Sequence, residues 1–177
     1  MDKKELRRQI RELKRAMTPE QIEQASLRLG ELFLETQQYK NAKTIYGYLP
    51  YNQEVRTVPM LEQALKDGKK VAVPKCYGDE MKFIYLEDLT QVELGYCNIP
   101  EPIADGPVAE DETALVLMPG MAFTKNGDRM GYGGGFYDKF LAKEPNHPTV
   151  ALCYSFQMVE SLPTAEYDIP VDCVLWA

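Results

Sequence analysis

The chain has 177 residues, of which 45% are hydrophobic and 27% charged, and its formal net charge is −7. This length allows one well-buried core and is short for two, so we expect a single domain over residues 1–177. No stretch reaches the roughly 20 apolar residues of a membrane helix, and the charged N-terminus lacks the apolar core of a secretory signal. We therefore expect a soluble, cytoplasmic protein with no membrane partner.

The charge is unevenly distributed along the chain. Residues 3–15 contain seven Lys or Arg and two Glu, a local charge of +5 that leaves −12 for the rest. An acidic body argues against a non-specific nucleic-acid binder, so we expect no nucleic-acid partner. A short basic segment suits a compact anion, such as a nucleotide phosphate or a glutamate tail.

The thiols and the single histidine do not form a metal-binding pattern. Cys76, Cys97, Cys153 and Cys173 include no CxxC pair, and His147 is the only histidine. A structural zinc site needs clustered thiolates or imidazoles, so we expect none. In a chain of this size and compartment we expect reduced, mostly buried thiols without a catalytic role.

The N-terminal third predicts two amphipathic helices. The first has one apolar stripe with spacings of 4, 3 and 4, formed by Leu6, Ile10, Leu13 and Met17. Next, Thr18 can cap a helix, Pro19 fits its first position, and Gln21 completes a capping box. The second helix is expected to run to about residue 38.

The remaining chain alternates short apolar strands with helices. Strands are predicted at 44–49, 70–74, 82–86, 114–118, 149–154 and 173–176, and helices at 57–66 and about 134–142. Residues 95–113 contain three Pro, two Gly and five acids, which predicts an irregular loop. The alternation predicts an α/β protein with a mostly parallel sheet covered on both faces. Ligands bind such sheets beyond the C-terminal strand ends, where residues 50–56 and 119–135 fall.

The glycine-rich segment before the 134–142 helix is the most informative stretch. Four glycines, at 131, 133, 134 and 135, separate an apolar strand from a helix. Their backbone N–H groups and the helix N-terminus can cradle a phosphate. The spacing is neither that of a Walker A loop nor GxGxxG, so another kind of nucleotide site is indicated. Read alone, the segment also fits a tight glycine turn without a ligand.

Side chains beside these glycines suit phosphate chemistry. Arg129 offers a forked donor to phosphate oxygens, and Asp138, in the first helical turn, offers an oxygen ligand to Mg²⁺. Phe136 and Tyr137 are expected to place one ring on the ligand side and one in the core. The alternative for Asp138 is a carboxylate that only complements the helix dipole.

The motif from Pro119 to Asp138, PGMAF followed by RMGYGGGFYD, resembles the signature of the 5-formyltetrahydrofolate cyclo-ligase family. The likeness extends to KKELR at residues 3–7, to YLP at 48–50 with Glu54, and to Val171-Asp172. It therefore covers nearly the whole chain in the family's order. One long motif with three supporting ones makes coincidence an inadequate explanation.

The resemblance implies a three-layer α/β/α fold with a deep cleft between the glycine loop and the first strand's exit. It implies an enzyme that uses ATP and Mg²⁺ to convert 5-formyltetrahydrofolate to 5,10-methenyltetrahydrofolate, with ADP and phosphate as further products.

The resemblance also implies the residues of the site. Its implied catalytic residues are Arg129 and Asp138, and its implied metal ligands are Asp138 and Asp172. Its implied ATP contacts are Lys3, Lys4, Arg7, Arg129, Gly131, Tyr132, Gly133, Gly134, Gly135, Phe136 and Tyr137. Its implied folate contacts are Leu49, Glu54, Tyr132, Gly133, Gly134, Gly135 and Phe136. The expected partner is a reduced folate, with or without a polyglutamate tail, and the expected state is a monomer.

Three of these positions also have a simple physical interpretation. Lys3 and Arg7 are four apart on one helical face, so both can approach one anion. A carboxylate at Glu54, in a loop at the ligand edge, can accept hydrogen bonds from a pterin. Without a ligand, these residues and Asp172 would be solvated surface charges. The chain departs from some members, which carry a basic residue at the places of Tyr132 or Gly134.

Two other functions share parts of this pattern. The same α/β layout can serve a phosphosugar or acyl-carrier binding module, because a fold does not fix a function. An RNA-binding protein could use the basic N-terminal helix, but the acidic body and the lack of interleaved aromatic residues disfavour it.

Overall fold

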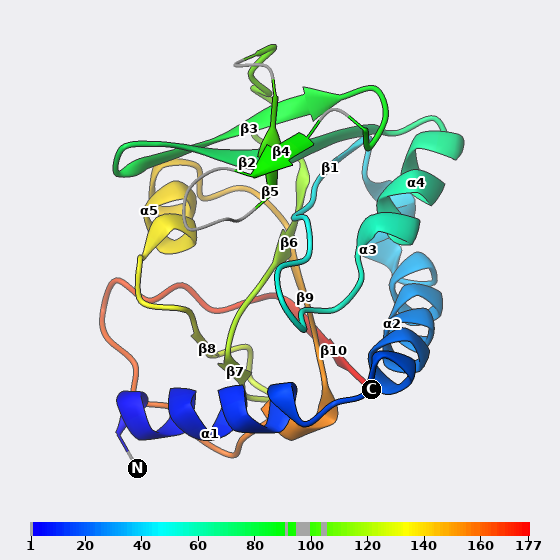
Figure 1. Ribbon diagram of the computed structural model, residues 1–177. Helices are drawn as coiled ribbons and strands as arrows, with labels where there is room; N and C mark the ends of the chain where they lie inside the picture. The colour runs from blue at the N-terminus through cyan, green and yellow to red at the C-terminus, as the bar shows by residue number, and fades with distance from the viewer. Residues whose placement is uncertain (1, 91, 95–99, 104–105) are drawn as a thin grey trace.

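Figure 1 shows the computed structural model, which describes residues 2–90, 92–94, 100–103 and 106–177. Its helices are α1 (Lys3–Arg15), α2 (Pro19–Leu34), α3 (Gln37–Asn41), α4 (Val58–Lys66), α5 (Phe136–Lys143) and the short 3-10 helix η2 (Ser155–Gln157). Its strands are β1 (Thr44–Tyr46), β2 (Lys70–Tyr77), β3 (Glu80–Leu86), β4 (Val92–Leu94), β5 (Pro100–Pro102), β6 (Leu115–Met118), β7 (Ala122–Phe123), β8 (Arg129–Met130), β9 (Thr149–Cys153) and β10 (Cys173–Trp176). No helix among the described residues has the length and apolar composition needed to cross a membrane.

The main sheet has six strands in the order β10-β9-β6-β1-β2-β3. The pairs from β10 to β2 are parallel, and only β3 runs antiparallel, to β2. Parallel strands β1, β6 and β9 are buried at every position, as expected when helices cover both faces. The predicted mostly parallel α/β sheet is confirmed.

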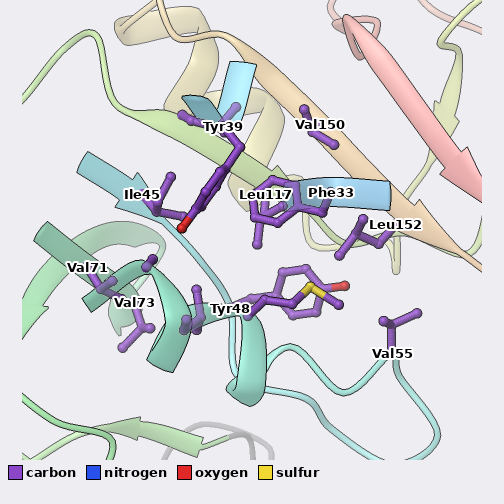
Figure 2. Close-up of a cluster of buried hydrophobic side chains, with 14 of the residues drawn as sticks. Phe33, Tyr39, Ile45, Tyr48, Val55, Val71, Val73, Leu117, Val150 and Leu152 are labelled. Atoms are coloured by element: carbon purple, nitrogen blue, oxygen red, sulfur yellow. The ribbon is translucent and has the colours of Figure 1, made fainter. Parts of the chain in front are cut away.

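Helices cover the two faces of the sheet and make three layers. One face packs on α2, α3 and α4 through a cluster that includes Phe33, Tyr39 and Leu61. Figure 2 shows Phe33 and Tyr39 beside Ile45, Leu117 and other side chains of the sheet. The opposite face packs on α5, which lies apart from the other helices in Figure 1. The three-layer α/β/α architecture is therefore confirmed.

Helix α1 lies across the end of the sheet where β7, β8 and η2 gather (Figure 1). Ile10 is buried with Met121, Ala122 and Met130 in a small separate cluster. The predicted apolar stripe is only partly correct, because Leu13 is 48% exposed whereas Lys14 is 7% exposed. The inward face of α1 thus carries a lysine where a leucine was expected.

Several predicted boundaries are displaced for local reasons. The Thr18–Gln21 capping box forms as expected, but α2 ends at Leu34 because Thr36 caps a separate helix, α3. Strand β2 continues through Pro74 to Tyr77. Pro74 is tolerated because β1 pairs with β2 only as far as Ala72, so no partner on that side needs its missing N–H.

Three further corrections concern chain segments without a clear strand pattern. Residues 100–102, predicted to lie in an irregular loop, form β5 against β4, while residues 95–99 and 104–105 of that predicted loop lie outside the described part. The β7–β8 hairpin was not predicted, because each strand has only two residues. Helix α5 begins at Phe136, two residues later than expected, because Gly135 at its N-cap is left-handed with φ of 70°.

Candidate functional site

The β7–β8 hairpin places Arg129 at the start of the glycine loop. Phe123 pairs with Arg129, and the Met121 N–H donates to the Met130 carbonyl at 2.7 Å. The chain then passes through residues 131–135 and enters α5, whose first turn contains Asp138. A hairpin and a helix N-terminus therefore flank the loop, and backbone N–H groups at a helix N-terminus favour anion binding.

The guanidinium of Arg129 is almost fully buried and only partly satisfied. Its side chain is 5% exposed, with Nη2 lying 3.3 Å from Asp138 Oδ2 and Nη1 donating to the Pro119 carbonyl at 3.1 Å. Its Cζ lies 5.9 Å from the centroid of the Tyr137 ring. Arg129 Nε and the Tyr137 hydroxyl are both buried without a hydrogen-bond partner. Buried donors are rarely left unpaired, so both groups are candidates to donate to a bound ligand.

Two of the loop glycines leave room for neighbouring side chains. A Cβ at Gly131 would lie 2.9 Å from Arg129 Nη1, and a Cβ at Gly134 would lie 3.0 Å from the Phe136 ring. Any side chain at position 131 would therefore displace the guanidinium. Residues 132–135 are exposed, which leaves their backbone accessible to a ligand.

Helix α1 brings its basic residues to the glycine loop and to a neighbouring segment. Arg7 Nε donates to the Gly131 carbonyl at 3.1 Å, and Lys3 Nζ lies 3.9 Å from Asp168 Oδ2. Lys4 is exposed. The structure thus brings Arg7 to the predicted phosphate loop, while Lys3 is paired with an acid that was not predicted.

The 50–56 loop carries Glu54 to the same side of the molecule. Its backbone is held by the Tyr154 hydroxyl, which donates to the Gln53 carbonyl at 2.6 Å, and by the Arg56 N–H, which donates to Ser26 Oγ at 2.9 Å. Burial raises the pKa of the Glu54 carboxyl, although the Lys14 ammonium opposes that shift. Glu54 is therefore a partly buried acid in a fixed loop rather than a solvated one.

The side chains of Tyr132 and Glu54 meet across the space between the two loops. Tyr132 donates to Glu54 Oε2 at 2.9 Å, and Lys14 Nζ donates to the Tyr132 hydroxyl at 3.4 Å. A deep cleft was expected here, and a cavity of about 530 Å³ in the described part of the chain lies at another place, beside Leu65, Tyr85 and Pro107. The Tyr132–Glu54 bridge occupies the expected opening.

Leu49, the predicted wall of the folate pocket, is a buried residue. It is 7% exposed and belongs to the large core cluster together with Tyr48 and Val55. This position places it at the base of the 50–56 loop, where it supports the loop from the core side.

The two predicted metal ligands have different surroundings. Asp138 faces Arg129, and its Oδ1 accepts the Ile169 N–H at 3.4 Å. Asp172, just before β10, is exposed, and its Oδ2 accepts the N–H of Thr149, the first residue of β9, at 2.9 Å. Among the described residues, no three His, Cys, Asp or Glu side chains form a metal cluster. A carboxylate with phosphate oxygens and waters is nevertheless a common Mg²⁺ environment, so Asp138 fits as a ligand.

The sequence pattern did not predict three of the groups that take part in these contacts. Lys14 was assigned to a basic surface, Asp168 was not considered, and the hydroxyl of Tyr137 was not distinguished from its ring. For Lys14 a signal existed, because it lies seven residues after Arg7 and four after Ile10 and so shares their helical face. For Asp168 we find no signal in the sequence.

The fold and the site together define an α/β protein with a glycine-rich loop between a hairpin and a helix N-terminus, at one end of its sheet. Comparison with known proteins identifies the family within this class of α/β proteins. The family model of the 5-formyltetrahydrofolate cyclo-ligase family matches residues 1–177, and the chain belongs to this family.

Individual relatives give the same result. The chain is 29% identical to a 5-formyltetrahydrofolate cyclo-ligase of Mus musculus, covering 98% of this chain and 93% of the relative. It is 29% identical to the protein of that name from Escherichia coli K12, covering 94% and 95%. Among solved structures, a 5,10-methenyltetrahydrofolate synthetase of Aquifex aeolicus superposes with a TM-score of 0.86 at 30% identity, covering 99% and 90% of the two chains. The likeness therefore extends over the whole molecule.

Proposed function

We propose that this protein is an ATP- and Mg²⁺-dependent ligase that converts 5-formyltetrahydrofolate to 5,10-methenyltetrahydrofolate, releasing ADP and phosphate. Membership of the cyclo-ligase family supports the reaction. The structural observation that carries the proposal is the pair of unpartnered buried donors, Arg129 Nε and Tyr137 Oη, beside the glycine loop. A phosphate group offers several acceptor oxygens and so suits two such donors.

The chemistry overcomes the low reactivity of a formamide. The formyl oxygen attacks the γ-phosphorus of ATP, the bond from phosphorus to the bridging oxygen breaks, and ADP leaves. N10 then forms a bond to the activated formyl carbon and loses its proton. The carbon–oxygen bond breaks, phosphate departs with the former formyl oxygen, and the N5–C–N10 cation remains.

Phosphoryl transfer of this kind depends on positioning and charge neutralisation more than on covalent chemistry by the protein. Arg129 and the backbone N–H groups of residues 131–137 would neutralise the transferring phosphoryl group, and Lys3, Lys4 and Arg7 would contact the triphosphate. Mg²⁺, when bound, supplies further charge neutralisation at the phosphate oxygens. Asp138 would hold it, with Asp172 as the second proposed ligand.

Folate recognition is assigned to the opposite loop. Glu54 would accept hydrogen bonds from the N–H edge of the pterin. Leu49, Phe136 and residues 132–135 complete the proposed folate contacts. The mechanism uses no cysteine nucleophile, which agrees with the buried state of Cys153, where burial raises the pKa of the thiol to about 12.

We further propose that residues 1–177 form one domain that acts as a cytoplasmic monomer on a reduced folate, with or without a polyglutamate tail.

The proposed reaction is tested by a product assay in which ADP and phosphate are measured with ATP–Mg²⁺, with and without 5-formyltetrahydrofolate. We expect both products at a 1:1 ratio, and only when the folate is present. ADP release independent of folate would contradict the proposal. Stabilisation by a phosphosugar but not by ATP–Mg²⁺ with folate would favour the binding-module alternative.

A further inference from the structure

Helix α1 buries a charged residue on its inward face. Lys14 is 7% exposed, whereas its neighbour Leu13 is 48% exposed. Lys14 follows Ile10 by four residues, so both lie on the face that packs against the β7–β8 hairpin. Burying an ammonium group costs several kcal/mol unless a partner offsets the loss of water. The position therefore requires an explanation in terms of what Lys14 contacts.

The contacts of Lys14 form a series of hydrogen bonds that connects three parts of the site. Lys14 Nζ donates to the Tyr132 hydroxyl at 3.4 Å and lies 5.6 Å from the centroid of the Tyr132 ring. The same hydroxyl donates its own proton to Glu54 Oε2 at 2.9 Å. This series of hydrogen bonds thus connects α1, through the glycine loop, to the 50–56 loop. Arg7, on the same helical face, holds the preceding loop residue through the Gly131 carbonyl.

The bridge leaves Glu54 able to bind a ligand. Oε1 accepts the Tyr51 N–H at 2.8 Å and Oε2 accepts the Tyr132 O–H. An ionised carboxylate has about four acceptor positions, so one remains on each oxygen. Two free acceptor positions suffice for the two adjacent N–H donors on the edge of a 2-amino-4-oxopteridine ring.

The charge of Lys14 acts on the ionisation of Glu54. Burial raises the pKa of Glu54, and among the opposing influences the Lys14 ammonium is the largest. Glu54 in turn opposes the decrease that burial imposes on the pKa of Lys14. Without the ammonium, Glu54 would hold a proton more readily, and one acceptor would become a donor facing the pteridine N–H groups.

We propose that Lys14 is a positioning residue for folate, which acts through Tyr132 to hold Glu54 as an oriented carboxylate. This inference rests on the proposed function and deepens it, because it assigns to α1 a role in folate selection beside its role at the triphosphate. Lys14 itself is separated from the pteridine by Tyr132 and Glu54.

The test compares Lys14→Met with wild type in steady-state kinetics. Methionine replaces the four-carbon stem with an unbranched apolar chain of equal length and removes the ammonium group, so folding is expected to be retained. We expect the KM for 5-formyltetrahydrofolate to rise about tenfold or more, because a hydrogen bond to a charged group is lost, while the KM for ATP stays within about twofold. Lys14→Arg should restore most of the folate affinity. Arg15→Met, an exposed neighbour on the same helix, removes the same charge and should leave both constants unchanged.

A double-mutant cycle tests whether Lys14 acts through Tyr132. Tyr132→Phe should weaken folate binding, and Lys14→Met in that background should weaken it little further. Full additivity, or an unchanged folate KM in Lys14→Met, would overturn the inference. If wild type does not turn over 5-formyltetrahydrofolate, the proposed function itself fails. If wild type is active and Lys14→Met matches it, only the role of Lys14 fails.

Discussion

The guanidinium of Arg129, on strand β8, lies 3.3 Å from the carboxylate of Asp138, in the first turn of α5. The pair joins the two ends of the glycine loop, so residues 131–135 are held between a hairpin and a helix. It also keeps the Arg129 fork oriented while Nε stays unpartnered. The relationship explains how a side chain beside a loop with four glycines is held in a fixed orientation.

Replacing Arg129 should therefore impair turnover more than folding. We expect Arg129→Met to lower kcat/KM by about 100-fold or more, as for loss of a donor to the charge that develops in a transition state. Arg129→Lys should recover only part of the loss, because an ammonium lacks the planar fork. Arg28→Met, which removes an exposed arginine paired with Glu31, is the matched control and should be neutral. Equal activity of Arg129→Met and Arg28→Met would contradict the assigned role.

Glu54→Gln should make the protein more stable and less active. Burial raises the pKa of Glu54 above its ordinary value of 4.5, so the folded protein binds this proton more tightly than the unfolded chain does. The resulting stability is fully present below about pH 4.5 and is lost as the pH rises through the folded-state pKa. Glutamine mimics the uncharged form, so its advantage in melting temperature should be largest near neutral pH and vanish in acid.

Melting curves of wild type and Glu54→Gln from about pH 4 to about pH 8 measure this difference. Glu62→Gln, an exposed acid on α4, should show no such dependence. A wild type that is as stable as Glu54→Gln at neutral pH would contradict the account of a carboxylate retained for function at the expense of stability.

Gly127 fixes the turn before β8 against the segment that leads to β10. Its φ is +93°, a Cβ there would lie 2.1 Å from the Val171 carbonyl oxygen, and the Val171 N–H donates to its carbonyl at 2.7 Å. Gly127→Ala should therefore reduce the free energy of unfolding by more than about 2 kcal/mol, through strain and a displaced backbone. Gly78 also has a positive φ, of +67°, but a Cβ there would meet nothing within 4 Å. Gly78→Ala should therefore reduce the free energy of unfolding by only about 1–2 kcal/mol. Urea denaturation compares the two, and equal losses would contradict the steric argument.

Local patterns in the sequence predicted much of the fold. Thr18 and Gln21 form their capping box, and the continuous apolar run before Pro119 forms the central strand β6. These predictions succeed because the interactions lie within a few residues of one another. The length of β2 was not predictable in the same way, because Pro74 is tolerated only where β1 has already ended.

The site was predicted in part. The glycine loop, Arg129 and Asp138 lie within one continuous motif, and the structure brings the last two together. Lys14 illustrates the opposite case. A helical stripe favours Leu13 as the buried residue, but the packing of α1 turns Lys14 inward toward Tyr132 and Glu54. That choice depends on residues 40 and 118 positions away, which a local pattern does not contain.

The most direct test of the account is near-ultraviolet absorbance of the purified protein with 5-formyltetrahydrofolate, recorded with and without ATP–Mg²⁺. We predict that the methenyl chromophore appears only when ATP–Mg²⁺ is present. Asp138→Ala should abolish the signal, while Asp79→Ala, which changes an exposed acid of the β2–β3 turn, should retain it. Folded wild-type protein that binds ATP but yields no chromophore would contradict the ligase assignment.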